Sequence, residues 1–219
     1  MNKLILVAAG GLAREVLTIE SALGRFDQIL LVDDDPTLWG RTIAGRPVVG
    51  GVDLVLEFED YHVLVCAGRG SGRRAIVERL LTMGIHRDRF TRTVHPQVDV
   101  PKGCVVGAGS IVLAGAVLTA DVQVGEHVVV MPNVTLTHDD VLEDYATVCA
   151  GASLGGGVRV CSEAYIGMNA AVRENLTVGA GATLGMGAVL LEEQPGHETW
   201  VGVPARPVRK LVIEMGESA

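Results

Sequence analysis

A period of six residues governs the second half of the chain and constrains its fold more than any other feature. From Val98 to Glu193 the sequence divides into sixteen consecutive hexapeptides without an insertion, and the third residue of each is Val, Leu or Ile. Ordinary alternating strands do not hold such a register, whereas a parallel β-helix repeats one short strand and one turn per block. Three blocks complete a triangular coil, so the repeat predicts about five coils.

The residue types within each hexapeptide indicate how a coil is built. The third-position aliphatic side chain is expected to point inward and stack on its counterpart in the next coil. The first position is mostly Ala, Val, Cys or Ser, which fit a narrow corner. Glycine is frequent at the fourth position, where we expect it to permit the turn. Aromatic residues make up only 4% of the chain, which agrees with regular stacking of small side chains.

The first half of the chain alternates short apolar runs with helical patterns. Apolar runs at residues 4–8, 29–32 and 63–67 predict strands, and helices are expected around residues 16–23 and 75–83. Continuous apolar strands between helices predict a small parallel sheet covered on both faces, as in a Rossmann-like α/β domain. We therefore expect a Rossmann-like domain at residues 1–93 and a β-helix with a C-terminal tail at residues 94–219.

Composition excludes several classes of partner. The net charge is −8 and no basic stripe occurs, which argues against binding to nucleic acid. No run of eighteen apolar residues predicts a membrane span, and the N-terminal segment lacks a signal-peptide cleavage pattern. The four cysteines are far apart and form no Cys-x-x-Cys pair, so we expect reduced thiols and a cytoplasmic location.

Several short motifs follow one another along the chain. They are Gly10-Gly11 with Arg14–Leu17, Val32–Asp34, Gly45–Gly50, Gly68 with Arg73, His95-Pro96, Thr137–Asp139 and Gly202–Arg206. Together with the repeat, they resemble the hexapeptide sugar O- and N-acetyltransferases of the sialic acid O-acetyltransferase and bacillosamine-pathway acetyltransferase type. The resemblance covers nearly the whole chain and implies a left-handed β-helix, a homotrimer and acetyl-CoA as the acyl donor, with no metal.

Acetyl transfer needs a base, an oxyanion donor and two substrates held together. By resemblance, His138 matches the catalytic base and Asp139 the neighbouring carboxylate, which can orient the imidazole and stabilise its cation. Imidazole suits this role because its ordinary pKa of ~6.5 lies near working pH. The only other histidine of the repeats, His127, is expected to be a solvated surface residue. Gly156 follows His138 by one coil, and we expect its backbone N–H to stabilise the oxyanion, a plain tight turn being the alternative.

The CoA arm is expected to lie along a groove between coils. The predicted contacts are Gly156, Gly167, Met168, Gly185 and Met186. Arg206 would meet the CoA phosphates, the alternative being a solvated arginine in the tail.

The first half of the chain is expected to bind the acceptor. A strand followed by Gly10-Gly11 and a helix can seat a phosphate on the helix N-terminus, and acidic residues after the second strand often meet a ribose or base. The predicted acceptor-binding residues are Gly10, Gly11, Leu12, Asp33, Asp34, Gly68 and Arg73. The resemblance implies that this domain holds a nucleotide-linked amino sugar over His138.

Three positions depart from the family pattern: Leu12, Met131 and Thr147 stand where polar residues are common. We expect an N-acetyltransferase that acts on a nucleotide-linked amino-deoxysugar by direct transfer in a ternary complex. The alternatives are O-acetylation of sialic acid or another surface-glycan sugar, and a nucleotide-sugar-binding protein without turnover. A zinc hydratase of the γ-carbonic-anhydrase type ranks last, because it needs three histidine ligands and the repeats contain two.

Overall fold

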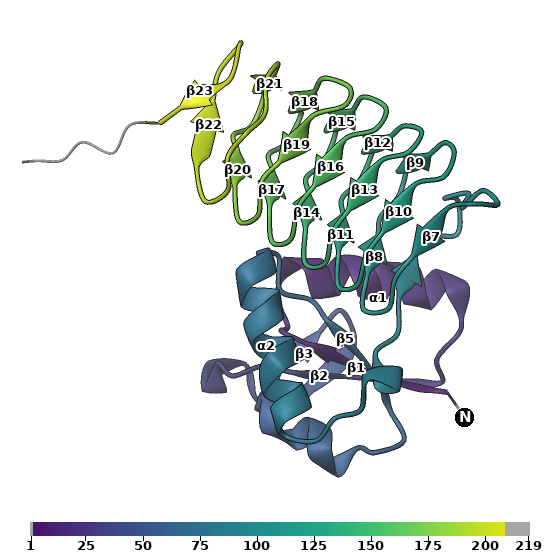
Figure 1. Ribbon diagram of the computed structural model, residues 1–219. Helices are drawn as coiled ribbons and strands as arrows, with labels where there is room; N and C mark the ends of the chain where they lie inside the picture. Colours follow the sequence, from purple (N-terminus) through teal and green to yellow (C-terminus); the bar gives the residue numbers. More distant parts are fainter. Residues whose placement is uncertain (1, 209–219) are drawn as a thin grey trace, which may run out of the picture.

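The computed structural model describes residues 2–208 and shows a small α/β domain beneath a triangular β-helix (Figure 1). The α/β domain contains a sheet of order β3-β4-β2-β1-β5, in which only β3 runs antiparallel to its neighbour. Its strands are β1 (Lys3–Val7), β2 (Gln28–Val32), β3 (Thr42–Ile43), β4 (Arg46–Gly50) and β5 (His62–Val65). Helices α1 (Gly11–Leu23) and α2 (Gly70–Thr82) complete it, with short 3-10 turns η1 (Pro36–Leu38), η2 (Val52–Glu57) and η3 (Arg87–Arg89).

The predicted two-sided sheet is confirmed by how β1 distributes its side chains. Leu4 and Leu6 pack with α1, whereas Ile5 and Val7 pack with α2. Successive residues of a strand point to opposite faces, so a continuous apolar run is what a sheet covered on both sides requires. The β3–β4 hairpin was not predicted, because its strands are short and half-exposed and contain Pro47.

The β-helix consists of three parallel sheets. Sheet 1 contains β7 (Val105–Val106), β10 (Gln123–Val124), β13 (Val141–Leu142), β16 (Arg159–Val160) and β19 (Thr177–Val178). Sheet 2 contains β6 (Thr93–Val94), β8 (Ile111–Val112), β11 (Val129–Val130), β14 (Thr147–Val148), β17 (Tyr165–Ile166), β20 (Thr183–Leu184), β22 (Thr199–Val201) and the antiparallel β23 (Arg206–Pro207). Sheet 3 contains β9 (Val117–Leu118), β12 (Thr135–Leu136), β15 (Ser153–Leu154), β18 (Ala171–Val172) and β21 (Val189–Leu190). The chain passes from sheet 1 to sheet 2 to sheet 3 and back to sheet 1. We name each corner by the two sheets that it connects, so that the turns from sheet 1 to sheet 2 form corner 1/2, and the other two corners are 2/3 and 3/1.

The register confirms the six-residue period. Gln123 lies opposite Val105 on one side and Val141 on the other, a step of eighteen residues each way. The third-position side chains from Val106 to Leu190 are buried and form one core, whereas Val100 in the first hexapeptide is 37% exposed. The expected parallel β-helix is therefore the fold of this half, and its parallel sheets match the left-handed winding that the resemblance implies.

The corners depend on the sixth residue of each hexapeptide and not on the fourth. The sixth residue has a positive φ in every block from Gly103 to Gly187, including 64° at Asp139. Fourth-position glycines do not, so the expectation that they permit the turn was wrong. A Cβ on Gly107 would lie 2.4 Å from the carbonyl oxygen of Gly125, which shows that this glycine allows adjacent coils to approach.

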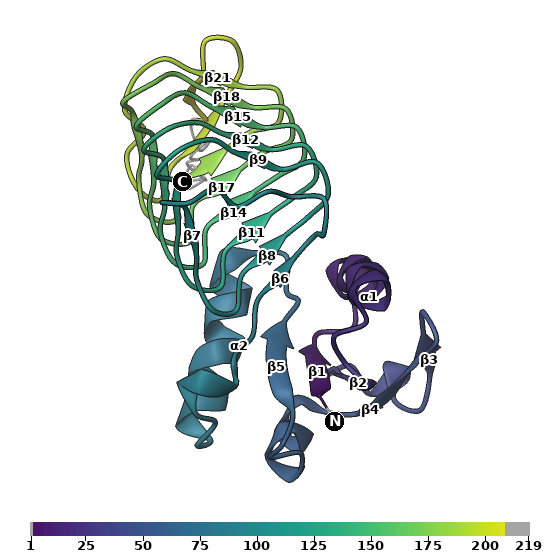
Figure 2. The same cartoon turned by 90° about the vertical axis from the view of Figure 1, so that its right-hand side faces the viewer.

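The two domains share a buried junction along sheet 2 and corner 1/2. Helix α1 packs against Ile111, Leu113 and Val129 of the β-helix. The start of α2 lies at corner 1/2, where a Cβ on Gly70 would be 2.2 Å from the Tyr145 carbonyl oxygen. Figure 2 shows both helices at the lower edge of the β-helix. No helix among residues 2–208 has the length and apolar character to cross a bilayer.

Arg73 on α2 fastens this junction. Its side chain is fully buried, and burial lowers its pKa to about 10, so the guanidinium remains charged at neutral pH. The guanidinium N–H groups donate to the carbonyl oxygens of Ala67, Gly68, His127, Tyr145 and Ala146 and to Thr147 Oγ1. The expectation that Arg73 binds the acceptor was therefore wrong, because protein oxygens occupy its donors.

His127 is buried at the same junction, so the expectation of a solvated surface histidine was also wrong. Its ring stacks on Tyr145 with centroids 5.3 Å apart and meets Phe90 edge-on at 4.8 Å. Burial, reinforced by the Arg73 charge, lowers the pKa of His127 to about 4. The His127 side chain points away from the core of the β-helix, as expected for a turn position. The α/β domain covers corner 1/2, however, and so buries the ring.

We predict that Arg73→Ala destabilises the protein by about 3–5 kcal/mol, because buried carbonyl oxygens lose a charged partner. The matched control is Arg74→Ala, one residue along α2. Arg74 is 48% exposed and pairs with Glu78 and Glu163, so its loss should cost far less than the loss of Arg73, because exposed ion pairs contribute little to stability. Chemical denaturation followed by circular dichroism measures both. Equal losses in the two variants would contradict the assigned role of Arg73.

The depressed pKa of His127 predicts an acid-linked loss of stability. Above about pH 6.5 the ring is neutral in both states. As pH falls from there towards the folded-state pKa of about 4, the unfolded chain takes up a proton that the folded chain does not. His127→Asn should remove this term, worth up to roughly 3 kcal/mol, and flatten the dependence of unfolding free energy on pH. His86→Asn, which changes an exposed histidine, should leave the dependence unchanged.

Candidate active site

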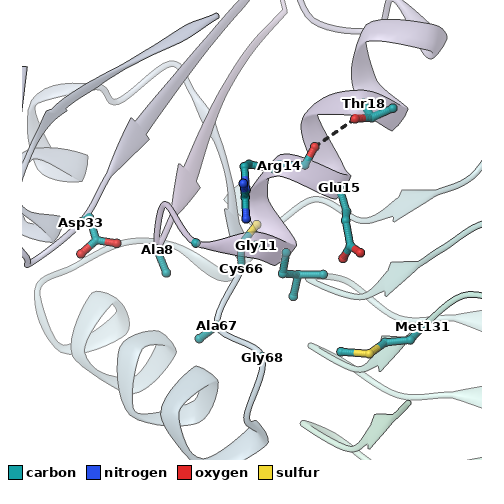
Figure 3. Close-up of a pocket in the computed structure, with 12 residues that line it drawn as sticks. Ala8, Gly11, Arg14, Glu15, Thr18, Asp33, Cys66, Ala67, Gly68 and Met131 are labelled. Carbon is teal, nitrogen blue, oxygen red and sulfur yellow. Dashed lines mark hydrogen bonds between the residues drawn. The ribbon is translucent and has the colours of Figure 1, made fainter. Parts of the chain in front are cut away.

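A cavity of about 700 Å³ lies where the carboxyl end of the sheet meets the β-helix (Figure 3). The β1–α1 loop, the first turns of α1, the end of β2 and the segment after β5 line it, together with Met131 of the β-helix. The structure thus brings together five of the predicted acceptor-binding residues, namely Gly10, Gly11, Leu12, Asp33 and Gly68.

Asp33 lines this cavity and holds the β1–α1 loop in place. One carboxylate oxygen accepts the Ala9 N–H at 2.8 Å and the other accepts the Asp35 N–H at 2.8 Å. These bonds hold the β1–α1 loop, in which Ala8 adopts a φ of 74°. Helix α1 then starts at Gly11 with no side-chain cap, so its first amides remain available to a ligand. This end of α1 favours an anion such as phosphate.

Sequence reasoning missed three residues of α1 that line the cavity: Arg14, Glu15 and Thr18. Their spacing from Gly11 follows the helical period, which places them on one face. That spacing was the signal that could have identified them. Figure 3 shows the Glu15 carboxylate directed towards Met131, so the cavity carries a cation, an anion and an apolar wall.

Asp34 lies outside the cavity lining, unlike its neighbour Asp33. Its Oδ1 accepts the Val52 N–H at 3.1 Å, and its Oδ2 pairs with Arg79 at 2.6 Å. The side chain therefore connects β2 to η2 and α2. This placement does not support the predicted contact of Asp34 with the acceptor.

His138 and Asp139 form an exposed pair at corner 3/1. His138 Nδ1 lies 2.8 Å from Asp139 Oδ2, and the two side chains are 68% and 67% exposed. An Nδ1–H that donates to Asp139 leaves Nε2 free to accept a proton. Within residues 2–208, no group of three or more His, Cys, Asp or Glu side chains is arranged to hold a metal ion.

Gly156 lies directly beneath the His138 ring. A Cβ at Gly156 would be 2.4 Å from both Cε1 and Nε2 of the imidazole, so any other residue here would displace the ring. The Gly157 N–H donates to the His138 carbonyl oxygen at 2.9 Å and holds the two turns together. In the part of the chain that the structure describes, the Gly156 N–H donates to no protein atom. The eighteen-residue spacing thus brings His138, Asp139 and Gly156 together.

Four of the residues predicted to contact CoA occupy a different corner, 2/3, namely Gly167, Met168, Gly185 and Met186. Met168 and Met186 follow one another at corner 2/3 and are 46% and 73% exposed. A Cβ on Gly167 would be 2.5 Å from the Met186 nitrogen, so the coils lie close together there. Met131 lies at the same corner two coils before Met168, and Ala150 stands in the coil between them. The apolar stripe formed by Met131, Ala150, Met168 and Met186 therefore begins at the cavity. Arg206 is exposed and pairs with Glu192 at 2.6 Å.

The three departures from the family pattern have different structural settings. Thr147 belongs to the domain junction, because its Oγ1 donates to the Gly68 carbonyl oxygen and lies 3.1 Å from the Arg73 guanidinium. Leu12 and Met131 both line the cavity and give it apolar surface. Only these two therefore bear on what the cavity binds.

Within one chain the cavity and His138 lie apart. The α/β domain contacts corner 2/3 at Met131 and corner 1/2 at Tyr145. Among residues 2–208, no side-chain hydrogen bond, ion pair or apolar cluster joins that domain to the turn of His138. The cavity and the histidine thus occupy separate corners of the triangular coil.

Comparisons with known proteins match both halves of the chain. Residues 3–80 match the family described as the PglD N-terminal domain. The acetyltransferase domain of PglB from Neisseria gonorrhoeae is 32% identical, with a TM-score of 0.87, over 95% of this chain and 100% of that one. A histidine-to-asparagine mutant of perosamine N-acetyltransferase from Caulobacter crescentus, in complex with CoA and GDP-perosamine, is 26% identical with a TM-score of 0.88. That likeness covers 96% of this chain and 98% of the other.

Curated relatives agree with the structural neighbours. GDP-perosamine N-acetyltransferase from Escherichia coli O157:H7 is 26% identical over 96% of this chain and 98% of its own length. The chain spans only 34 to 46% of the length of three other curated acyl- and acetyltransferases that it matches. The relatives that match the whole chain therefore combine an α/β domain and a β-helix in one chain, as this protein does.

Proposed function

This chain belongs to the hexapeptide-repeat sugar acetyltransferases. We propose that it transfers an acetyl group from acetyl-CoA to the amino group of a nucleotide-linked amino-deoxysugar. The observation that carries the proposal is the His138–Asp139 pair above Gly156, which combines a base with an oxyanion donor. The amine is favoured over a hydroxyl as nucleophile because the relatives that match the whole chain include GDP-perosamine N-acetyltransferase.

The cavity of the α/β domain is the proposed acceptor site. The amides at the start of α1 and the Arg14 guanidinium would bind the diphosphate of a sugar nucleotide. The sugar would then extend towards Glu15 and the apolar wall of Leu12 and Met131. Gly10, Gly11 and Gly68 would allow the ligand to approach the backbone closely, because these residues have no side chain. The space that a Cβ would occupy at each of them is open to the cavity.

The apolar stripe at corner 2/3 is the proposed path of the CoA arm. Met168 and Met186 present exposed thioethers beside Gly167 and Gly185, which suits a pantetheine chain of mixed polarity. Arg206 would exchange its exposed partner Glu192 for a CoA phosphate. The C. crescentus relative binds CoA and a nucleotide sugar together, which supports a ternary complex here.

A homotrimer would unite these parts. His138 at corner 3/1 faces away from the cavity and the stripe of its own chain, so the site is complete only if a second copy places its corner 3/1 there. In a closed three-fold ring, corner 3/1 of each subunit meets corner 2/3 of the next. The same contact then occurs three times, and no subunit has an unused contact surface. Each of the three sites would then take His138 from one subunit and the cavity from the next.

In the proposed reaction, His138 Nε2 removes a proton from the amine as its nitrogen attacks the thioester carbonyl carbon. The Gly156 N–H stabilises the oxyanion, and Asp139 stabilises the imidazolium through Nδ1–H. The C–N bond forms, the C–S bond breaks, and the proton held on His138 passes to the CoA thiolate. The products are the N-acetyl sugar and CoA, and no covalent enzyme intermediate is required.

The first test is turnover of acetyl-CoA with UDP-, dTDP- and GDP-linked amino sugars and with free sialic acid, followed by thiol release. One amino sugar should support turnover, and His138→Ala should lower kcat by ~100-fold or more, as expected for loss of a general base. His86→Ala is the matched surface-histidine control and should retain full activity. Full activity in His138→Ala would eliminate this base, and turnover only with sialic acid would favour O-acetylation.

Gly156→Ala should lower kcat by ~100-fold, because a Cβ 2.4 Å from Cε1 and Nε2 must displace the His138 ring. Backbone strain does not enter, since Gly156 lacks a positive φ. Gly72→Ala is the control, because no atom lies within 4 Å of its added Cβ. Both kcat and the melting temperature are measured. Wild-type kcat in folded Gly156→Ala would contradict the close packing of ring and glycine during catalysis.

A further inference from the structure

We propose that Asp140 is the positioning residue that holds the His138 turn against the Gly156 turn. The inference rests on the function proposed above and adds a residue that does not touch either substrate. Asp140 directly follows the His138–Asp139 pair, but its side chain points into the β-helix and is fully buried. It therefore acts from behind the site.

Two hydrogen bonds link Asp140 to the two turns. Its Oδ2 accepts the Thr137 N–H at 2.8 Å, and its Oδ1 accepts the Val158 N–H at 2.9 Å. Thr137 directly precedes His138, and Val158 directly follows Gly157. One carboxylate therefore joins the start of the turn that carries the base to the end of the turn that carries the oxyanion donor. The distance between His138 and the Gly156 amide depends on both ends of this bridge.

The fold itself does not require an acidic residue at this position. Asp140 is the first residue of its hexapeptide, where a small apolar residue fills the corner. Seven other hexapeptides have a buried alanine at the first position, namely Ala116, Ala146, Ala152, Ala164, Ala170, Ala182 and Ala188. Burying a carboxylate is costly unless strong donors compensate it. A buried aspartate at the one corner turn that carries the His138–Asp139 pair therefore indicates a role in the site.

The charge state of Asp140 suits this bridge. Burial raises the pKa of its carboxyl to about 6, while the bonds from Val158 and Thr137 and the nearby His138 act in the opposite direction. The carboxyl is therefore mostly ionised at neutral pH. An ionised carboxylate accepts both amide bonds without a competing hydroxyl proton. Bonds to a charged acceptor are stronger than neutral ones, which suits a constraint on a catalytic turn.

Ser110 provides an internal comparison. It is also a buried first-position residue, and its Oγ accepts the N–H of Val128, eighteen residues further on, at 2.8 Å. It donates to the Gly125 carbonyl oxygen at 2.8 Å. Ser110 lies at corner 1/2, away from His138, so it makes the same coil-to-coil bond without a catalytic neighbour. Ser110→Ala is therefore the matched control for loss of such a bond.

The experiment compares Asp140→Ala, Asp140→Ser and Ser110→Ala by steady-state kinetics with acetyl-CoA and the acceptor. Asp140→Ala should lower kcat by at least ~10-fold while both KM values change less than ~3-fold, because a misplaced base affects the transition state and not substrate binding. Asp140→Ser can restore the bond to Val158 but not that to Thr137. Its kcat should therefore lie between that of Asp140→Ala and that of the wild-type protein. Ser110→Ala should keep the wild-type kcat. Wild-type kcat in a folded Asp140→Ala would overturn the proposal.

A double-mutant cycle separates positioning from a general structural effect. If Asp140 acts through His138, Asp140→Ala should cause no further loss in the His138→Ala background. A full additional loss there would overturn the proposal. Amide exchange gives a readout independent of turnover: the Thr137 and Val158 amides should lose protection in Asp140→Ala, and unchanged protection would also overturn it.

These outcomes are distinct from failure of the proposed function. Full activity in His138→Ala removes the base assignment, whatever Asp140→Ala does. Absence of turnover by the wild-type protein with every acceptor removes the acetyltransferase function, and with it this inference.

Discussion

The β-helix depends on one backbone conformation, the left-handed φ at the sixth residue of each hexapeptide. This conformation is costly for most residues, and glycine, asparagine and aspartate tolerate it best. At corners 2/3 and 3/1 every sixth residue with a positive φ is one of these three types. At corner 1/2 the positions hold His127, Tyr145 and Glu163 between two glycines. The bulky exceptions therefore all face the α/β domain, where their contacts can offset the strain.

The same constraint explains how the site is assembled. A left-handed residue turns the chain sharply and projects the preceding side chain outward, which is how Asp139 leaves His138 exposed on the corner. The next coil repeats the corner eighteen residues later, so Gly156 must lie beside His138. Counting in units of six predicted this pair from the sequence, because the spacing is set by covalent geometry and not by long-range packing. The inward stacking of third-position side chains was predictable for the same reason.

Other parts of the structure could not be derived from a local pattern. Arg73 and His127 occupy positions that look exposed along the chain, and only the docking of one domain on the other buries them. Asp34 and Asp33 are adjacent acids after the same strand, yet only Asp33 lines the cavity, because Arg79 and the Val52 amide hold Asp34. Asp140 reads as one more acid in a polar run, and its burial becomes clear only when the first position of the hexapeptide is seen to face the core. For Arg73, His127 and Asp34, the deciding contacts join segments far apart in the sequence.

The separation of the cavity from His138 has a consequence for how such a protein can vary. Residues that line the proposed acceptor cavity belong to the α/β domain and to corner 2/3. His138, Asp139 and Gly156, the proposed base, carboxylate and oxyanion donor, belong to corner 3/1. Substitution of Leu12 or Met131 changes the wall that a sugar would meet and leaves the His138–Asp139–Gly156 geometry untouched. Polar family positions can therefore become apolar here while the arrangement of His138, Asp139 and Gly156 is kept. Under the proposed function, the β-helix sets the transfer chemistry and the α/β domain sets the acceptor, so the choice of acceptor can change more freely than the chemistry.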